Sequence, residues 1–308
     1  MKLKNLFKLS YLEILFYILL ITLIIVFLCK STKEGFVEEK KEFIRKTDSD
    51  IFDNFYVDIY DDLLYNNQKN NFEVERVLRG NSGDSMILDI GSGTGHHVNL
   101  LSRDNNTVIG VDNSPAMINI AKKNYPELDF RLADVLDSMQ FSANSFTDIA
   151  CLYFTIYYIK NKKQFLENCF KWLKPHGKLV LHLVNMNKFD PIIPVANPFV
   201  TVSPQSYVDK RITESNVIFN NFKYKSDFQL DKTIDIHGSV NKPNATFKET
   251  FKFDNGKKAR INEHKLYMSS QQYILSLARD IGFILQSQEE MDSVQYENNY
   301  LYTLVKPS

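Results

Sequence analysis

The sequence has few cysteines and no excess of charge of either sign. Only Cys29, Cys151 and Cys169 are present among its 308 residues, and their spacing fits neither a disulfide framework nor a zinc site. Lys and Arg together number 37, as do Asp and Glu, so the formal net charge is zero. A nucleic-acid binder that relies on bulk positive charge is therefore not indicated. A reducing compartment is the simplest interpretation of the cysteine content.

Charged residues are also nearly absent from residues 11–29, which form an almost continuous apolar run with Glu13 as its single charged residue. A helix of this length spans about 30 Å, the thickness of the hydrocarbon core of a bilayer. No small-x-small cleavage site follows the run, which disfavours a cleaved signal peptide. The sequence therefore predicts a single-pass transmembrane anchor within residues 1–30. More Lys and Arg residues flank its C-terminal side, which predicts a cytoplasmic location for the rest of the chain.

Glycine is sparse, with 11 residues, yet Gly91, Gly93 and Gly95 alternate within one short stretch. The stretch begins as a buried strand at residues 86–90, which includes Asp89. The glycines let the backbone turn tightly before a helix that is predicted to begin at about residues 94–97. Such a helix start directs free N–H groups at an anion. Together these features predict the ligand-binding corner of a doubly wound sheet.

The spacing of these glycines separates two kinds of cofactor. A nicotinamide site needs glycine at the sixth position, where this chain has His96. The pattern Asp-x-Gly-x-Gly-x-Gly instead resembles motif I of class I S-adenosylmethionine (SAM)-dependent methyltransferases. In that family the turn holds the methionine part of SAM. An NAD or nucleotide-sugar enzyme on the same layered sheet is the disfavoured enzyme alternative.

Two further predicted strands end in an acidic residue. Residues 107–112 form a short apolar strand ending in Asp112, about 20 residues after the glycines, where an acid binds ribose hydroxyls in this architecture. The helix that follows contains Met117. A third strand, at residues 130–134, ends in Asp134, and the resemblance implies that this acid accepts from the adenine amino group.

Later segments follow the same order. Residues 145–159 predict a fourth strand and a tyrosine-rich loop that resembles the family's methyl-transfer region. Residues 172–180 (Trp-Leu-Lys-Pro-x-Gly-x-Leu-Val) resemble its helix–Pro-Gly–strand element. Several amine methyltransferases carry a histidine where this chain has Tyr158. The Asn/Asp-Pro-Pro-Tyr motif of adenine and amide methylation is absent, which disfavours DNA and glutamine substrates.

Prolines then interrupt the pattern, and residues 190–265 show partial apolar/polar alternation. Asp254-Asn-Gly256 is a hairpin signal between the last two runs. We expect an inserted antiparallel sheet that caps the cofactor cleft. His237 and His264 are expected to be surface or cross-strand residues because neither has metal-ligand spacing. A capped helix at residues 269–283 is followed by two strands that complete the main sheet as an antiparallel pair.

The predicted fold class is α/β, with a Rossmann-like doubly wound seven-stranded sheet, an inserted antiparallel β cap and a preceding transmembrane helix. The predicted segments are a transmembrane anchor (1–30), a juxtamembrane linker without chemistry (31–50), a SAM-binding methyltransferase core (51–189), an inserted cap and substrate region (190–265) and the C-terminal part of the core (266–308).

The resemblance implies transfer of a methyl group from the cofactor SAM to a small-molecule acceptor by in-line displacement. Tyr60 lies in a Tyr-x-x-x-Tyr-Asp segment that resembles the family's helix closing over SAM, although ordinary helix packing gives the same spacing. The residues assigned to SAM are Tyr60, Asp89, Gly91, Gly93, Gly95, Asp112, Met117 and Asp134.

No residue is assigned a catalytic role, and no metal is expected. Tyr60, Tyr158 and Asp148 are unranked candidates for a base that deprotonates an amine acceptor. The acceptor, its reacting atom and the oligomeric state are left open. The alternative from another class is a membrane-anchored SAM-binding or scaffold domain without turnover.

Overall fold

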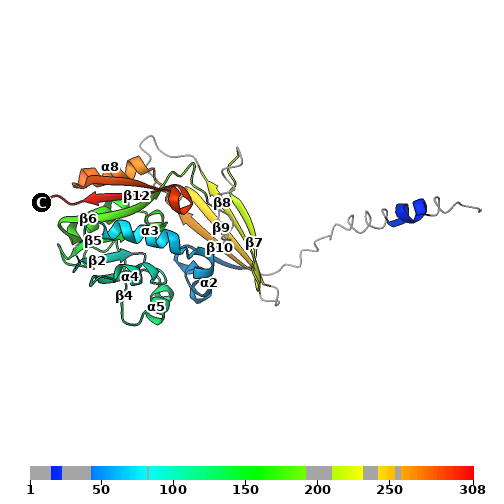
Figure 1. Cartoon of the computed structure of the whole chain (residues 1–308), viewed down its shortest axis with the longest axis horizontal. Coiled ribbons are helices and arrows are strands. Elements are labelled where there is room, and N and C mark those ends of the chain that lie inside the picture. The colour runs from blue at the N-terminus through cyan, green and yellow to red at the C-terminus, as the bar shows by residue number, and fades with distance from the viewer. Residues whose placement is uncertain (1–14, 23–42, 82, 192–209, 232–241, 254–257) are drawn as a thin grey trace, which may run out of the picture. The chain divides into compact units, whose positions relative to one another are not determined.

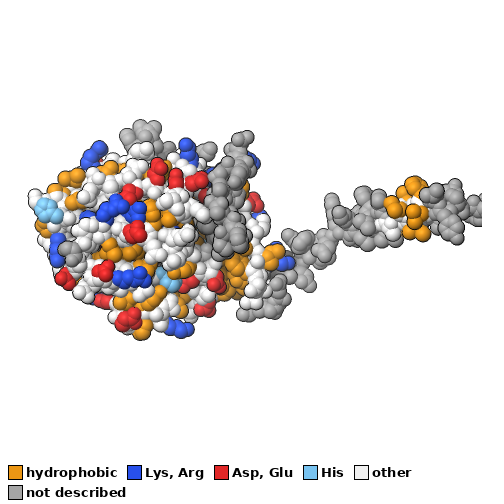
Figure 2. Space-filling model, in the orientation of Figure 1, with side chains coloured by type: hydrophobic (Ala, Val, Ile, Leu, Met, Phe, Trp, Pro, Cys, Tyr) orange, Lys and Arg blue, Asp and Glu red, His pale blue; other side chains and the backbone are white. Residues whose placement is uncertain are grey.

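The structure, a computed structural model, describes residues 15–22, 43–81, 83–191, 210–231, 242–253 and 258–308. The chain divides into two units, Met1–Glu42 and Phe43–Ser308. In the first unit residues 15–22 are α-helical, and their large apolar side chains are exposed (Figure 2). Within the described ranges, no helix has both the length and the apolar character needed to cross a membrane. The other residues of the predicted anchor lie outside the described residues.

The main sheet of the second unit has seven strands in the order β11-β12-β6-β5-β2-β3-β4 (Figure 1). Strands β2 to β6 run parallel to one another, whereas β12 is antiparallel to both β6 and β11. The predicted Rossmann-like sheet and its antiparallel last pair are confirmed. The strands are β2 (Met86–Ile90), β3 (Thr107–Asp112), β4 (Asp129–Leu132), β5 (Phe146–Cys151), β6 (Leu173–Val184), β11 (Ile284–Met291) and β12 (Tyr296–Val305).

Helices cover both faces of this sheet because its central strands are apolar on both sides. Ile87 of β2 packs with α3, α4 and α5, whereas Leu88 and Ile90 pack with α6, α7 and α8 on the other face. The helix α8 begins at an N-cap serine and ends at Gly282, as predicted. The helices are α3 (Asn67–Leu78), α4 (His96–Leu101), α5 (Pro115–Asn124), α6 (Thr155–Tyr158), α7 (Lys162–Trp172) and α8 (Gln271–Ile281).

A second sheet has five strands in the order β1-β10-β9-β8-β7 (Figure 1). Strands β7 to β10 are antiparallel, as predicted for the inserted segment. β9 and β10 pair on either side of the predicted hairpin turn, and that turn and His237 lie outside the described residues. The strands are β1 (Ile44–Thr47), β7 (Glu214–Ile218), β8 (Phe222–Leu230), β9 (Ala245–Phe253) and β10 (Arg260–Leu266).

The N-terminal edge of this sheet differs from the prediction. Residues 44–47 were expected in a linker, but they form β1, which pairs in parallel with β10. The 3-10 helix η1 (Asp48–Ile51) follows directly. The segment Ile-Arg-Lys-Thr is short and charged, so it carries no apolar alternation that could reveal an edge strand.

The helix α2 (Asn54–Leu64) connects the two sheets. Its N-cap is Asp53, whose side chain accepts from the backbone N–H of Tyr56. Tyr56 and Val57 pack with β8 and β9 of the second sheet and with Met117 of α5. α2 is therefore held between the second sheet and the helix that follows β3, close to the C-terminal ends of the parallel strands.

Candidate functional site

The glycine turn lies at the end of β2, where the strand order of the main sheet reverses. Gly91, Gly93 and Gly95 have φ values of 73°, 53° and 93°, which other residues adopt only with strain. A Cβ at Gly91 would overlap the side chain of Thr155, and one at Gly95 would lie 2.8 Å from the ring of Phe130. The turn therefore has the close backbone packing that the sequence predicted for these glycines.

Asp112, at the end of β3, contacts the same turn. Its Oδ2 accepts from the N–H of Gly93 at 3.1 Å, and its Oδ1 accepts from the N–H of Ser114 at 2.9 Å. Burial raises the pKa of Asp112, while these backbone hydrogen bonds oppose the shift. A carboxylate has about four acceptor positions, so two hydrogen bonds leave capacity for two adjacent hydroxyls.

Two buried polar atoms beside the turn have no hydrogen-bond partner among the described residues. They are Oδ2 of Asp89 and Oγ of Ser92. Burial raises the pKa of Asp89 to about 6, while His97 lowers it and Glu73 raises it. Because buried polar atoms are nearly always satisfied, these two indicate a ligand with hydrogen-bond donors at this position. The ammonium group of SAM is such a donor, so the residues present fit this cofactor.

Tyr60 lies over the turn from α2. A Cβ at Gly93 would lie 3.8 Å from Cε1 of the Tyr60 ring. Burial raises the pKa of Tyr60, with further contributions from Tyr153 and then Asp112. The structure thus brings Tyr60, Gly93 and Asp112 together, as the sequence predicted, and their contact with SAM stays a prediction.

His96 and Asp61 attach α2 to the glycine turn, a role that the sequence analysis missed. Nε2 of His96 lies 2.9 Å from Oδ2 of Asp61, and Oγ1 of Thr94 donates to Oδ1 of Asp61 at 2.7 Å. In the sequence, His96 is distinguished only as the residue that breaks the nicotinamide pattern. Its position at the first turn of α4 is the signal that could have indicated this contact.

Asp134 and Met117 occupy different surroundings. Asp134 is exposed just beyond β4, and its Oδ1 accepts from the N–H of Leu136 at 2.9 Å. The N–H of Ala133 donates to the carbonyl of Asp112 at 3.0 Å, which keeps the ends of β3 and β4 together. Met117 is buried in the cluster between α2 and the second sheet. Both stay predicted cofactor residues.

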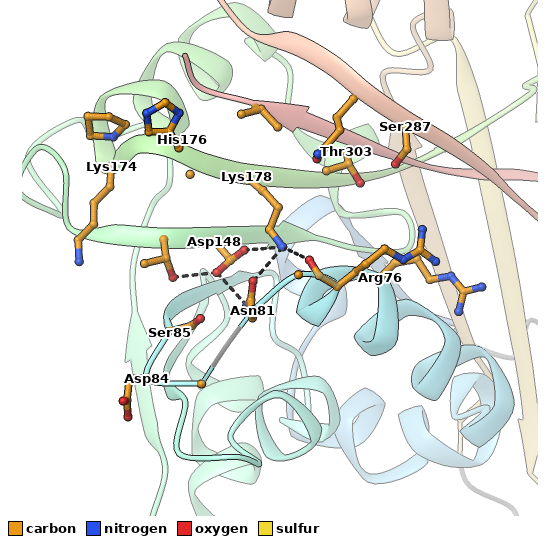
Figure 3. Close-up of a pocket in the computed structure, with 18 of the residues that line it drawn as sticks. Arg76, Asn81, Asp84, Ser85, Asp148, Lys174, His176, Lys178, Ser287 and Thr303 are labelled. Carbon is orange, nitrogen blue, oxygen red and sulfur yellow. Dashed lines mark hydrogen bonds and ion pairs between the residues drawn. The ribbon is translucent and has the colours of Figure 1, made fainter. Parts of the chain in front are cut away.

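The predicted role of Asp148 as a candidate base does not fit its position. Asp148 is the third residue of β5, so it lies toward the opposite edge of the sheet from the glycine turn. There it lines a cavity of about 750 Å³ (Figure 3). Its Oδ1 forms a buried ion pair with Nζ of Lys178 at 3.1 Å, and its Oδ2 accepts from Asn81. Asp148 therefore holds the N-terminal edge of the sheet together.

Tyr158 and His264 form a contact that the sequence did not predict. The hydroxyl of Tyr158, at the end of α6, lies 2.8 Å from Nδ1 of His264 on β10. His264 is a cross-strand residue, paired in register with Phe247, but the expected surface alternative is wrong because it is buried. Arg260, Asn262 and His264 alternate along one buried polar face of β10, and that spacing is the signal that could have found them.

Comparisons with known proteins agree with this geometry. Residues 88–181 match the family model described as "Methyltransferase domain". Demethylmenaquinone methyltransferase from Tropheryma whipplei is 31% identical over 107 residues, which are 34% of this chain and 44% of that protein. Residues 88–181 form a class I methyltransferase domain. SAM is the cofactor of this class of domain, as predicted.

Solved structures extend the similarity to the fold of most of the chain. The sugar N-methyltransferase KedS8 from Streptoalloteichus sp. matches with a TM-score of 0.54 and 18% identity, covering 78% of this chain and 87% of that one. A SAM-dependent methyltransferase from Clostridium acetobutylicum matches with a TM-score of 0.61 and 16% identity, covering 83% and 99%. These identities establish a shared fold only. The chain spans less than half the length of the curated relatives that it matches.

Proposed function

We propose that the whole chain is a SAM-dependent methyltransferase that acts on a small-molecule acceptor. The observation that carries this proposal is the hydrogen bond of 3.1 Å between Asp112 and the N–H of Gly93, which fixes the acid against the glycine turn. Asp89 and Ser92 support it because each has a buried oxygen without a partner in the described part of the chain. A binding module without turnover is the second candidate.

In the proposed mechanism this chain mainly binds and aligns the two reactants. SAM, when bound, supplies an electrophilic methyl group on a positively charged sulfur. Asp112 would hold the ribose hydroxyls, and Asp89 would accept from the ammonium group of the methionine part. Tyr60 and α2 would exclude water from the reacting centre. Alignment alone can lower the barrier by several kcal/mol, about 7 to 11 in well-oriented cases.

The small-molecule acceptor is supported by the second sheet and by the structural neighbours. The second sheet and α2 pack together beside the cofactor turn, which limits the room for a macromolecular substrate. One neighbour of the same fold is named as a sugar N-methyltransferase. A compact polar metabolite is therefore our proposed class of acceptor.

The test has two stages. Isothermal titration of the full chain with SAM should give saturable binding, and Asp112→Ala should weaken it at least tenfold. Asp129→Ala removes an exposed acid on neighbouring β4 and serves as the matched control. Incubation with methyl-labelled SAM and a small-molecule extract should then label an extract component. Absence of binding would overturn the cofactor assignment, whereas binding without transfer to any fraction would favour the scaffold alternative.

We also propose that residues 11–29 anchor the chain in a membrane, with the methyltransferase domain in the cytoplasm. The apolar run in the sequence supports the anchor, and the flanking Lys and Arg residues support the orientation. Alkaline carbonate extraction of expressing cells should leave the full chain in the membrane pellet and release a variant that begins at Phe43. Full extraction of the intact chain would contradict the anchor. Protection of the domain from protease added to intact cells would support its cytoplasmic location.

A further inference from the structure

A buried carboxylate, Glu249 of β9, lies at the centre of the second sheet's inner face. Its Oε1 accepts from the hydroxyls of Tyr56 at 3.1 Å and Tyr224 at 2.9 Å. Its Oε2 accepts from Nδ2 of Asn262 at 3.1 Å and faces Nε2 of His264 at 2.8 Å. Burial alone would raise the pKa of Glu249, but His264, and after it Asn262 and Tyr224, outweigh the effect of burial and lower the pKa. Glu249 is therefore ionised.

The charge on Glu249 determines which nitrogen of His264 carries the proton. An ionised carboxylate can only accept, so Nε2 of His264 donates to it. In the neutral imidazole Nδ1 is then the acceptor, and the hydroxyl of Tyr158 donates to Nδ1. The resulting order of hydroxyl, imidazole and carboxylate resembles a catalytic triad, in which the imidazole takes the proton of the hydroxyl.

Among the described residues, exposure to solvent decreases along this chain of hydrogen bonds. Tyr158 is 36% exposed, whereas His264 and Glu249 are 1% and 0% exposed. The phenols of Tyr60 and Tyr153 lie close enough to raise the pKa of Tyr158 further, after burial and together with Glu249. Tyr60, which lies over Gly93, is therefore the residue that relates Tyr158 to the cofactor turn.

The surroundings favour a positively charged acceptor. The phenols of Tyr60 and Tyr153 lie within electrostatic range of Tyr158, and aromatic faces attract cations; the ring of Tyr153 already has Nζ of Lys69 5.0 Å from its centroid. Tyr153 has a φ of 51°, a strained conformation that is common at functional sites. Glu249 contributes a negative charge behind Tyr158. The other charged group of this network, Arg260, donates to Asn262 and is paired with Asp53.

We propose that Tyr158, supported by His264 and Glu249, deprotonates an amine acceptor for methyl transfer. This inference rests on the proposed function and names its substrate class. The ammonium group of the acceptor gives a proton to the oxygen of Tyr158, while Tyr158 passes its own proton to Nδ1 of His264. The freed lone pair forms the nitrogen–carbon bond as the carbon–sulfur bond breaks, and its electron pair stays on sulfur, giving S-adenosylhomocysteine.

In this step Tyr158 is the catalytic residue, because it touches the acceptor. His264 and Glu249 are positioning residues that hold the proton as an imidazolium–carboxylate pair until solvent removes it. The positive charge moves from the sulfonium and the acceptor to the methylated amine and His264, so charge is conserved.

The experiment uses the full chain, methyl-labelled SAM and a small-molecule extract that is separated on a cation exchanger. We expect label in the retained fraction, and its loss when that fraction is N-acetylated beforehand. Tyr158→Phe and His264→Gln should each lower the initial rate about 100-fold, while the SAM dissociation constant changes less than about twofold. Tyr300→Phe, on β12 away from this site, is the matched control and should retain the wild-type rate.

A pH profile separates catalysis from a structural role. At saturating SAM, the wild-type rate should fall toward acidic pH, because a protonated imidazole cannot accept, and His264→Gln should flatten this limb. A wild-type rate in Tyr158→Phe, or label only in the unretained fraction, overturns the inference while leaving the methyltransferase assignment intact. Absence of transfer to every fraction overturns both. If His264→Gln does not fold, Tyr158→Phe decides, since it removes one oxygen only.

Discussion

Three buried carboxylates around the glycine turn differ in how their charge is balanced. Glu73 of α3 is held by Lys69 and His97 on Oε2 and by His182 on Oε1, at 2.8, 2.8 and 3.0 Å. Glu249, in contrast, has no Lys or Arg partner among the described residues: its partners are one imidazole, His264, and the neutral side chains of Asn262, Tyr56 and Tyr224. The difference indicates that Glu73 is neutralised for structure, whereas Glu249 retains negative charge that can stabilise a protonated neighbour.

Asp89 is the third case, because its Oδ2 has no partner in the described part of the chain. A carboxylate without a partner is costly to bury, which fits a position that a ligand completes. The three acids therefore form a series from structural to ligand-dependent, and five predictions test that series.

The largest effect on stability is expected from Glu73→Ala. The change leaves the ammonium of Lys69, which is 3% exposed, buried without its carboxylate. We expect a loss of about 3 to 5 kcal/mol in the free energy of unfolding, measured by urea denaturation. The double variant Lys69→Met/Glu73→Leu is the control and should recover most of the loss. A loss in Glu73→Ala below about 1 kcal/mol would contradict the structural role of this pair.

Glu249→Gln should affect turnover more than stability. The amide retains the shape of the side chain and can accept from Tyr56 and Tyr224, but it cannot stabilise a protonated His264. We expect the transfer rate to fall about 100-fold, with a loss of about 1 to 3 kcal/mol in unfolding free energy. Parallel rate and denaturation measurements check this. A rate loss no larger than that of Glu73→Gln would remove the contrast between the two glutamates.

The raised pKa of Asp89 predicts that SAM binding depends on pH. Its pKa in the folded protein is raised to about 6 by burial, so the carboxylate becomes protonated as the pH falls through 6. The protonated form loses its attraction for an ammonium group, and SAM binding should weaken about tenfold per pH unit below 6. Titration calorimetry from about pH 5 to about pH 8, a range that brackets this pKa, measures how SAM affinity changes with pH. Asp89→Asn should remove this pH dependence.

The same shift has a consequence for stability, with a definite sign. A carboxylate whose folded pKa is raised favours folding in its protonated form, so its contribution is fully present below the unfolded pKa of 3.8 and is lost as the pH rises through about 6. Compared with the wild type, the cofactor-free Asp89→Asn variant should therefore gain more stability at neutral pH than at about pH 4, which is near the unfolded pKa. Urea denaturation of both proteins at the two pH values measures this difference.

Tyr224→Phe should have the smallest effect. It removes one of two hydroxyl donors to Oε1 of Glu249, and Tyr56 remains as the other. We expect a loss of about 1 to 2 kcal/mol in unfolding free energy and less than about a fivefold change in rate. Tyr302→Phe on β12 provides a comparison for the loss of a phenol without a Glu249 contact. A rate loss equal to that of Tyr158→Phe would assign the proton path to Tyr224 instead.

Much of the main sheet and the cofactor turn could be predicted because their signals are local. Short apolar strands followed by Gly91 or by Asp112 place these residues at the same edge, since the carboxyl ends of parallel strands meet there. The sequence could not show that Asp148, one of three unranked candidates for a base, lies early in β5, because the bounds of a strand are less well defined in a sequence than its existence. A residue early in a parallel strand lies toward the opposite edge.

The relay of Tyr158, His264 and Glu249 could not be predicted because it depends on long-range pairing. His264 and Glu249 lie on different strands, and Tyr158 is 106 residues from His264 in the sequence. Polar residues on an alternating strand are usually read as facing solvent, but here one polar face is turned inward against α2 and α6. Register between β9 and β10, which the structure provides, decides which side is buried.

The parallel pairing of β1 with β10 has a mechanical consequence. Tension applied to the chain ahead of Phe43 would run along β1 and load its ladder with β10 lengthwise, so that several backbone hydrogen bonds resist together. β10 is the strand that contains His264. The four residues that pair with β1 end at Glu263, so loss of this ladder would leave the edge of β10 next to His264 without its backbone partner.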